Sequence, residues 1–397
     1  MADALTPKTA EHVEEAVQWA LGAETPLEVV GAGSKRAFGR PGGGAALLDL
    51  SALSGIALYE PEELVMTAGA ATPIAEIDAA LAENRQQLDF EPADLGPLWG
   101  GAADQGTIGG AIASNLSGPR RFKAGSARDH ILGFKAVSGR GEAIKSGGRV
   151  IKNVTGFDLC KLMTGSFGTL AVLTEVTFKV LPAAETSRTI AITGTSREVA
   201  LDIMTKALQS PFEVSAAAHL TAPVAAGFGG PATLIRLEGH PPSVEYRCQA
   251  LRDLLAGPGD AGEVEDADSR ALWRQVRDAS LFDPQADNQI WRLSVPPSQC
   301  MEVAEALERA VDGSVYFDWG GGLLWLEMAP RPDAAHREVR RAAGGGHATL
   351  VRAGEEVRAS VPVFHPQPAA LAALGKRIKE SFDPKRILNP GRMVQDH

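Results

Sequence analysis

The chain has 397 residues, of which 44% are hydrophobic and 22% are charged, and this composition excludes a wholly disordered protein. The formal net charge is −10 at pH 7, whereas general nucleic-acid binders are basic, so we expect no nucleic-acid partner. A phosphate-bearing ligand would have to be held by backbone amides and a few local cations rather than by the overall charge.

The cysteines indicate a reducing compartment. Cys160, Cys248 and Cys300 lie far apart and form no CxxC pair, so no disulfide framework is predicted and too few thiols exist for an iron–sulfur cluster. The first 20 residues have no apolar core typical of a signal peptide, and the weakly apolar segment 214–235 is interrupted by prolines. These features predict a cytoplasmic protein without a transmembrane segment.

The first part of the chain combines short predicted strands with two helices. Residues 9–21 are predicted to form a helix because apolar residues recur along one face. A second helix is predicted to have Thr72 as its N-cap and Pro73 as its first residue. Strands are predicted at 27–30, 47–50, 64–68, 131–137, 142–144 and 172–180, the last one half-buried.

The pattern changes after Pro182, where strands begin to alternate with helices. Helices are predicted at 196–209, 243–256 and 298–310. Strands are predicted at 188–193, 213–220, 233–238, 290–295, 314–318 and 323–327. This order predicts an α+β domain with helices on one side of a sheet, and no long internal repeat is detected. A helix followed by an extended tail is predicted for 368–397.

Glycine-rich loops follow several of the early strands. The turn at Gly31, Gly33, Ser34 and Lys35 could direct backbone amides at a diphosphate, or could be an ordinary glycine turn. It matches neither the dinucleotide-binding GxGxxG pattern nor a P-loop. The small residues at 100–118 suit either a flat ligand or close packing of a helix on a strand.

The stretch from 147 to 170 is the most informative one. It places a cation and an amide, Lys152 and Asn153, between glycine turns and next to the long strand at 172–180. A flavin needs positive or hydrogen-bonding groups near the ring edge that becomes negatively charged on reduction. The residue types in this stretch therefore fit a flavin.

Four segments together carry a family resemblance: TIGGAIASNLSGPRR at 107–121, KNVTGFDLCKL at 152–162, GSFGTLAVLTE at 165–175 and FDPKRILNPGRM at 382–393. With them the chain resembles the FAD-linked oxidase family, whose fold is of the vanillyl-alcohol-oxidase or p-cresol-methylhydroxylase type. Within that family it is similar over essentially its whole length to the smaller, E-type flavin-binding subunits of bacterial glycolate oxidases.

The resemblance implies an α+β fold with three parts: an FAD-binding domain of two subdomains at 1–182, a ferredoxin-like cap at 183–366, and a C-terminal segment at 367–397 that returns to the flavin. It implies that the diphosphate meets Gly31, Gly33, Ser34, Lys35, Thr107, Gly109 and Gly110. It implies a further flavin-facing loop with Ser117, Arg120, Ser126, Arg128 and Asp129. It also implies that the flavin and adenine are lined by Lys152, Asn153, Gly156, Gly165, Gly168 and Val172, and that Asn389 and Arg392 approach the isoalloxazine.

Two departures from the family pattern refine this expectation. Some relatives bind FAD covalently through a histidine of the first glycine loop, but no histidine lies between His12 and His130, so non-covalent FAD is implied. Relatives that oxidise 2-hydroxy acids carry closely spaced metal-binding histidines, whereas the later histidines of this chain are scattered, so no metal is expected.

His347 and Arg292 are the candidate catalytic residues. His347 lies in a glycine turn and could act as a general base, although a structural role is the common alternative. Arg292 could bind a substrate carboxylate with two parallel hydrogen bonds, or could be a paired surface arginine.

The resulting interpretation is an FAD-binding subunit of a glycolate oxidase complex. It would oxidise glycolate, or a similar short 2-hydroxy acid, and pass electrons to a larger flavin-binding subunit and an iron–sulfur subunit. Association with the inner membrane would be peripheral and made through those partners. Two alternatives stay open: an accessory FAD-binding subunit with a structural or relay role, and a self-sufficient FAD-dependent 2-hydroxy-acid dehydrogenase.

Overall fold

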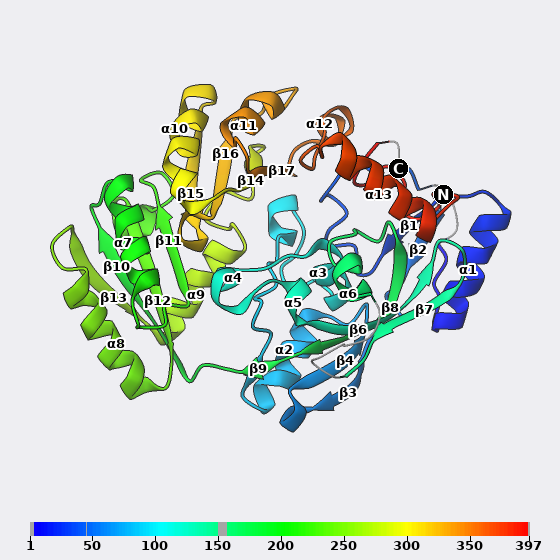
Figure 1. Cartoon of the computed structure of the whole chain (residues 1–397), viewed down its shortest axis with the longest axis horizontal. Coiled ribbons are helices and arrows are strands. Elements are labelled where there is room, and N and C mark those ends of the chain that lie inside the picture. Colours follow the sequence, from blue (N-terminus) through cyan, green and yellow to red (C-terminus); the bar gives the residue numbers. More distant parts are fainter. Residues whose placement is uncertain (1–3, 45, 150–156, 396–397) are drawn as a thin grey trace. The chain divides into compact units, whose positions relative to one another are not determined.

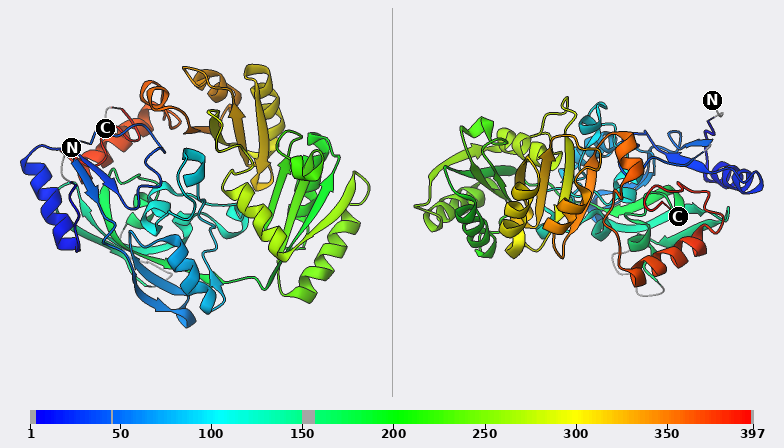
Figure 2. Two further views of the ribbon diagram at one scale, coloured as in Figure 1. Left: turned by 180° about the vertical axis from the view of Figure 1, so that it is seen from behind. Right: turned by 90° about the horizontal axis from the view of Figure 1, so that it is seen from above.

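The computed structural model describes residues 4–44, 46–149 and 157–395, which form two compact units (Figures 1 and 2). The first unit comprises Met1–Ser117, Gly125–Pro182 and Pro366–His397. The second comprises Gly118–Ala124 and Ala183–His365. The short segment Gly118–Ala124 therefore belongs to the second unit, although the residues on both sides of it belong to the first. Lys152, Asn153 and Gly156, which the sequence predicts to bind FAD, lie outside the described residues.

The first unit is built on an antiparallel sheet that has five strands among the described residues. Their order is β3 (Ile56–Glu60), β4 (Val65–Gly69), β8 (Ala171–Lys179), β6 (Ile131–Ser138) and β7 (Ala143–Gly147). The short helices α2 (Ile74–Glu83), α3 (Ile108–Ser114) and α6 (Leu159–Met163) contribute apolar side chains to one core with this sheet. Strand β8 is buried along almost its whole length because it is central, so the prediction of a half-buried strand is wrong.

A second, smaller layer of the first unit carries the first glycine loop. Strands β1 (Leu27–Val30) and β2 (Ala46–Asp49) pair in parallel, and helix α1 (Ala10–Gly22) packs with them through its apolar face. Thr9 caps α1, as its position before the apolar pattern indicates. The C-terminal helix α13 (Ala369–Phe382) is followed by a tail whose Ile387 and Leu388 enter the same core.

The predicted N-cap of α2 is wrong by one residue. Pro73 occupies the cap position, and the Thr72 hydroxyl instead donates to the carbonyl of Gly69 at 2.7 Å and accepts from the amide of Gly55 at 2.9 Å. The Thr72 hydroxyl is thus occupied by the turn that ends β4. The remaining short elements of this unit are α5 (Ala127–His130), the pair β5 (Gln86–Gln87) with β9 (Leu181–Pro182), and the 3-10 turns η1 (Pro61–Glu63) and η2 (Gly96–Trp99).

The second unit is one continuous antiparallel sheet of eight strands. Their order is β13 (Asp260–Glu265), β10 (Thr186–Thr193), β12 (Ala232–Gly239), β11 (Ala216–Leu220), β15 (Gly313–Asp318), β16 (Leu323–Met328), β14 (Gln289–Ser294) and β17 (His347–Arg352). The chain order of the elements repeats. The first half runs β10, α7 (Arg197–Gln209), β11, β12, α8 (Pro241–Leu254) and β13. The second half runs β14, α10 (Cys300–Ala310), β15, β16, α11 (His336–Ala342) and β17.

Each half has the βαββαβ order of a ferredoxin-like fold, so the cap is a structural duplication. In each half the fourth strand lies beside the first and the third lies between the first and second. The second strands of the two halves, β11 and β15, join them through the pairs His219 with Phe317 and Leu220 with Tyr316. The sequence shows no long internal repeat, and the duplication is visible in the topology, which depends on apolar periodicity rather than on residue identity.

The two faces of this sheet differ. Helices α7, α8, α10 and α11 pack on the face that carries Ile190, Trp291 and Leu293 in two apolar cores. The opposite face of the first half is covered by α9 (Asp266–Arg277), because Trp273 Nε1 donates to Thr189 Oγ1 at 2.8 Å. The prediction that all helices lie on one side is therefore incomplete. The remaining helices, α4 (Arg121–Ala124) and α12 (Glu355–Ser360), and the 3-10 turns η3 (Ala226–Phe228), η4 (Pro297–Gln299) and η5 (Trp319–Gly321) lie in connections.

Candidate functional site

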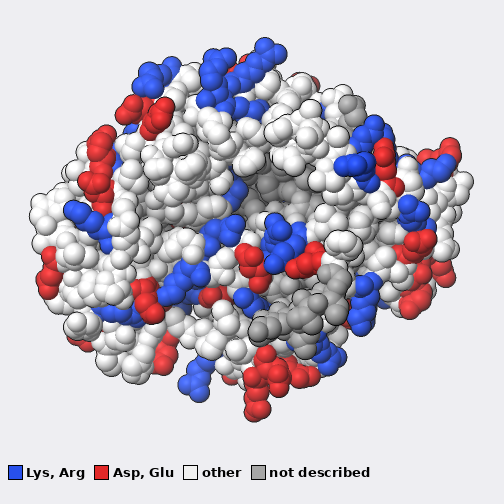
Figure 3. Space-filling model, in the orientation of Figure 1, with Lys and Arg blue, Asp and Glu red and all other residues white. Residues whose placement is uncertain are grey.

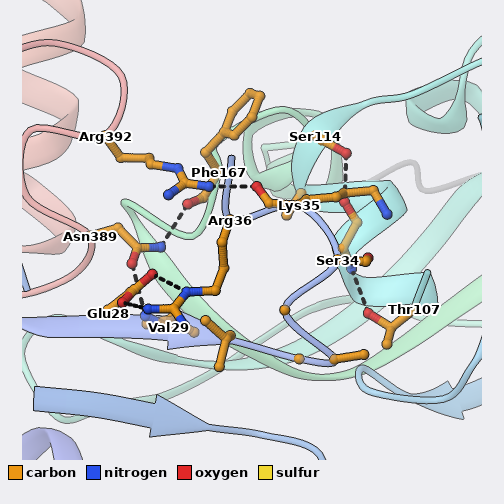
Figure 4. A pocket seen from close by; sticks show the side chains of 16 residues that line it. Glu28, Val29, Ser34, Lys35, Arg36, Thr107, Ser114, Phe167, Asn389 and Arg392 are labelled. Atoms are coloured by element: carbon orange, nitrogen blue, oxygen red, sulfur yellow. Dashed lines mark hydrogen bonds and ion pairs between the residues drawn. The ribbon is translucent and has the colours of Figure 1, made fainter. Parts of the chain in front are cut away.

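Two adjoining pockets lie in the first unit at the end of β1, and Figure 4 shows the one that Lys35 and Arg392 line. Each has a cavity volume of about 100 Å³. The residues that line both are Val29, Gly31, Thr107, Gly110, Ala113, Phe167 and Asn389. They come from the loop after β1, the start of α3, the loop before β8 and the C-terminal tail. Four segments that are distant in the sequence therefore form one site.

Close backbone approach explains the glycines of the first two segments. A Cβ atom on Gly31 would lie 3.0 Å from Thr107 Oγ1, and one on Gly109 would lie 2.5 Å from the carbonyl oxygen of Ala70. Thr107 caps α3, since its Oγ1 accepts a hydrogen bond from the amide of Gly110 at 3.2 Å. Side chains at these glycines would fill the space between the loop and the helix, so the glycines make a cradle with bare backbone walls.

The pocket contains a lysine that is available for an anion. The Lys35 side chain is half-buried, and the structure gives its ammonium no ion-pair or hydrogen-bond partner among the described residues. Burial lowers the pKa of Lys35, and the negative charge of Asp94 partly opposes that shift. The neighbouring Arg36 is instead paired with Glu28 at 2.6 Å. Lys35 is thus suited to binding a phosphate group. The phosphate would compensate the ammonium for the hydration that it loses on burial.

The C-terminal tail closes the opposite wall of the pocket. Asn389 accepts a hydrogen bond from the amide of Val29 and donates one to the carbonyl of Phe167, both at 2.8 Å. Arg392 donates to the carbonyl of Lys35 at 2.7 Å. Gly168 has φ +67°, and a Cβ atom there would lie 2.8 Å from Asn389 Nδ2, so this position requires glycine for both reasons.

The structure brings ten of the predicted FAD-binding residues to these pockets. The residues are Gly31, Gly33, Ser34, Lys35, Thr107, Gly109, Gly110, Gly168, Asn389 and Arg392. The sequence reasoning missed Phe167, Ala113 and Ser114, which also line them. Ala113 and Ser114 follow Thr107 on the same helix, so their place could have been found from helical spacing, whereas no local pattern indicated Phe167.

Other predicted FAD-binding residues of the first unit make structural contacts. Ser117 Oγ accepts from the amide of Ala127 at 3.0 Å, and the Asp129 carboxylate accepts from the amide and hydroxyl of Ser126 at 2.8 and 2.9 Å. Val172 is fully buried among apolar side chains. These contacts hold the backbone of the segment in place. Gly165 has φ +84° and packs beside Asn115, and Arg128 is exposed. Cofactor contacts by these residues stay a prediction.

Arg120 belongs to the second unit, where it enters a buried cluster. Its Nε lies 3.1 Å from a carboxylate oxygen of Glu238, and Arg236 Nε lies 3.2 Å from the same group. Burial disfavours the charged form of Glu238, but Arg236 and Arg120 outweigh burial and lower its pKa. The arginine that the sequence assigns to a flavin loop is thus held by a carboxylate of strand β12.

Arg292 and His347 lie on the face of the second half of the sheet that α10 and α11 do not cover. Arg292 pairs across the sheet with Thr349, and the next pair on that face is Ser294 with His347. Diagonal neighbours on one face lie about 7–8 Å apart, so one small ligand could meet both side chains. The sequence analysis did not predict that Arg292 and His347 would be neighbours.

The environment of Arg292 suits an anion. Its guanidinium lies over the Trp319 ring at 4.9 Å, and no hydrogen-bond or ion-pair partner is found for it among the described residues. Burial lowers its pKa to about 10, with Asp318 opposing, so the group stays charged at neutral pH. Trp319 itself has φ +53°, an uncommon backbone angle for a bulky residue, and such strain is often found at ligand sites.

His347 is exposed and has a neighbour that the sequence did not reveal. Its ring lies 5.1 Å from that of His365, in an edge-on arrangement. His365 Nδ1 accepts a hydrogen bond from the amide of Ala348 at 3.3 Å. In the described part of the chain no group of three or more metal-ligating side chains is found.

The comparisons with known proteins define the class. Residues 2–147 match the FAD binding domain family, and residues 366–393 match the C-terminal domain of FAD linked oxidases. The fold is shared with p-cresol methylhydroxylase, with a TM-score of 0.71 and 15% identity over 99% of this chain and 88% of that chain. It is also shared with 4-ethylphenol oxidase from Gulosibacter chungangensis, with a TM-score of 0.67, 15% identity, and 98% and 88% covered. Fold and pocket are those of an FAD-linked oxidase.

Relatives with higher sequence identity identify the family within the FAD-linked oxidases. Glycolate oxidase subunit GlcE of Escherichia coli (strain K12) is 36% identical over 382 residues, which are 96% of each chain. Glycolate oxidase subunit GlcD of Bacillus subtilis (strain 168) is 27% identical over 72% of this chain and 68% of its own. The chain belongs to the GlcE family of FAD-linked oxidoreductases. The expected fold class, enzyme class and FAD cofactor are thereby confirmed. Among the described residues, no helix has the length and apolar character needed to span a bilayer.

Proposed function

We propose that this chain is the FAD-binding subunit of a glycolate oxidase complex and takes part in oxidising glycolate, or a similar short 2-hydroxy acid, to the 2-oxo acid. The observation that carries the proposal is the pocket of the first unit, where Lys35 has no ion-pair or hydrogen-bond partner among the described residues and lies beside glycine backbone. The family relationship to GlcE supports the choice of substrate class.

The first unit would hold the cofactor through its backbone and two cations. The amides of 31–35 and the Lys35 ammonium would bind the diphosphate, while Asn389 and Arg392 would contact the cofactor from the C-terminal tail. When bound, FAD supplies the capacity to accept two electrons. The glycines of the cradle keep side chains out of that volume.

The second unit would hold the substrate carboxylate at Arg292. A charged guanidinium next to an indole ring offers two parallel hydrogen bonds to a carboxylate, and a small 2-hydroxy acid has one such group. His347, on the same face, is the candidate acceptor of the hydroxyl proton. If the chain is instead an accessory relay subunit, substituting Arg292 or His347 should not change turnover.

We propose that the electrons leave this chain through a complex with other subunits. Oxidation of one 2-hydroxy acid releases two electrons and two protons, and the three cysteines are individually buried and separate from one another. An iron–sulfur cluster would therefore have to belong to another subunit. We propose a larger flavin-binding subunit and an iron–sulfur subunit as partners, and a cytoplasmic complex that meets the inner membrane through them. In Figure 3 acidic and basic side chains are interspersed over the face shown.

The deciding experiment is an anaerobic absorbance titration of the purified chain. We expect a flavin spectrum that acid or heat releases as intact FAD. Glycolate should bleach it slowly in the isolated chain and rapidly in the co-expressed complex. Equal turnover per flavin with a dye acceptor would instead favour the self-sufficient dehydrogenase. A folded chain that neither carries nor rebinds FAD would overturn the proposal.

A further inference from the structure

A buried ion pair on helix α13 lies behind the tail of the candidate FAD pocket. Lys379 and Asp383 are 4% and 0% exposed, and their charged groups are 2.6 Å apart. The Lys379 ammonium also donates to the carbonyl of Thr169 at 2.7 Å and to the carbonyl of Leu388 at 3.0 Å. Since an ammonium has three protons, all its donors are used within the protein.

The carboxylate of this pair is equally engaged. Asp383 accepts from the amide of Ile387 at 3.0 Å and from the amide of Leu388 at 2.9 Å. A Cβ atom on Gly139 would lie only 2.4 Å from the Asp383 side chain, so a glycine leaves room for the carboxylate. One pair of side chains therefore hydrogen-bonds to two amides and one carbonyl of the tail.

The carbonyls held by Lys379 adjoin the pocket wall. Thr169 follows Gly168, which lines the pocket, and Leu388 precedes Asn389. Asn389 ties the same two segments on the pocket side, through Phe167. The loop before β8 and the C-terminal tail are thus joined twice, once by Asn389 in the wall and once by Lys379 behind it.

We infer that Lys379 and Asp383 are positioning residues that hold the C-terminal tail against the loop before β8 and thereby set the affinity for FAD. The inference rests on the proposed FAD site. A buried ion pair is a weak source of net stability relative to an apolar pair, because desolvation offsets the attraction. Its effect here is geometric, since it fixes four backbone groups, three of which belong to the tail that carries Asn389 and Arg392. Without it the tail opens more often and FAD dissociates faster.

The test uses three variants of the full chain. K379M leaves the buried Asp383 carboxylate without its cation, so it is expected to destabilise the protein most. K379M/D383L removes both charges and keeps the volume apolar, so it should fold even where K379M does not. K385M is the matched control, because Lys385 is an exposed cation of the same segment that is not among the lining residues of either pocket and pairs with Glu24 at 3.5 Å.

Two readouts are measured on each variant. Hydrogen exchange of the FAD-free protein reports whether the amides of 387–389 become less protected. A fluorescence titration with FAD gives Kd, and a stopped-flow chase gives the dissociation rate. For K379M/D383L we expect at least tenfold faster exchange at 387–389 and a Kd raised at least tenfold, mostly through dissociation. K385M should match the unchanged protein in both.

The outcomes separate the inference from the function it rests on. If K379M/D383L folds with unchanged exchange at 387–389, or with faster exchange but an unchanged Kd, the positioning role is wrong. If the unchanged protein itself does not rebind FAD, the proposed function fails, and the inference falls with it. Faster exchange together with a raised Kd, and neither in K385M, supports the inference.

Discussion

Arg292 and His347 lie on neighbouring strands, β14 and β17, and on the same face of the eight-stranded sheet. Strand register brings them together, because Arg292 pairs with Thr349 and the next pair on that face is Ser294 with His347. The helices of this half cover the other face, where Trp291 and Leu293 are buried. Arg292 holds a charged guanidinium against the Trp319 ring, and such a group is suited to binding the carboxylate of a small acid.

Replacing Arg292 by methionine should lower kcat/KM for glycolate in the assembled complex by about 10- to 150-fold, the equivalent of about 1.5–3 kcal/mol for a hydrogen bond to a charged group. Lysine at this position should recover part of the loss, because it keeps the charge but not the paired donors. The measurement is dye reduction at several glycolate concentrations.

The control for Arg292 is R309M, which removes an exposed cation whose carboxylate partner is Glu305 at 3.5 Å. It should leave turnover unchanged. If R292M also leaves kcat/KM unchanged while FAD content stays full, the carboxylate is bound elsewhere and the accessory reading gains support.

Replacing Lys35 by methionine should raise the Kd for FAD by about 10- to 100-fold, because one charge-assisted hydrogen bond to the diphosphate is lost. In the unchanged protein, affinity should fall as pH rises through the Lys35 pKa, which burial lowers relative to an ordinary lysine. K35M should lose this alkaline dependence. The exposed Lys145 provides the control, and K145M should bind FAD normally. An unchanged Kd in K35M would show that Lys35 does not meet the cofactor.

Much of the fold follows from local sequence patterns. The apolar face of residues 9–21 predicted α1, and short apolar runs predicted β1, β2 and β4. Some missed elements are polar in sequence, while others, such as β3 and β17, are short apolar runs that were not assigned. Helix α9 and strand β13 are rich in charged residues, and their positions depend on contacts such as Trp273 with Thr189 that no local pattern reveals. The duplication of the cap was hidden for the same reason.

Some residues of the site were predicted from the sequence and others were not, and the difference has a physical cause. Gly31 lies in a glycine turn that the sequence itself shows, whereas Thr107 and Asn389 were assigned through the family resemblance. Long-range pairing decided the rest. Two contacts depend on register and packing between distant segments. One is the ring contact of His347 with His365, and the other is the pairing of Arg120 with Glu238 in the second unit. No spacing rule in one sequence contains that information.

Replacing Gly168 by alanine should weaken FAD binding and lower stability by about 1–3 kcal/mol, since the new Cβ meets Asn389 Nδ2 and the backbone is left-handed. Gly100 supplies a matched control, because it has φ +76° with open space around it. G100A reports the backbone strain alone. The excess effect of G168A, measured by urea denaturation and FAD titration, is the effect of displacing Asn389. Equal effects in the two variants would argue against any such displacement.

His219 should make the second unit sensitive to acid. It is 1% exposed, its Nδ1 lies 3.0 Å from Thr233 Oγ1, and its Nε2 is buried without a hydrogen-bond partner among the described residues. Burial, and to a lesser degree Arg197, lower its pKa from 6.5 to about 4. The folded state therefore binds a proton less readily than the unfolded state does.

The sign of the effect follows from linkage. A histidine with a lowered folded pKa contributes its full stability above pH 6.5 and loses it progressively as pH falls toward 4. At pH 5 the loss should be about 2 kcal/mol. Urea denaturation at pH 7.5 and 5, followed by tryptophan fluorescence, measures it. The H219Q variant, which cannot titrate, should be less stable at pH 7.5 but should lose about 2 kcal/mol less on acidification. H240Q is the control, because His240 is exposed. If H219Q and the unchanged protein lose stability equally between the two pH values, His219 is not the group that titrates.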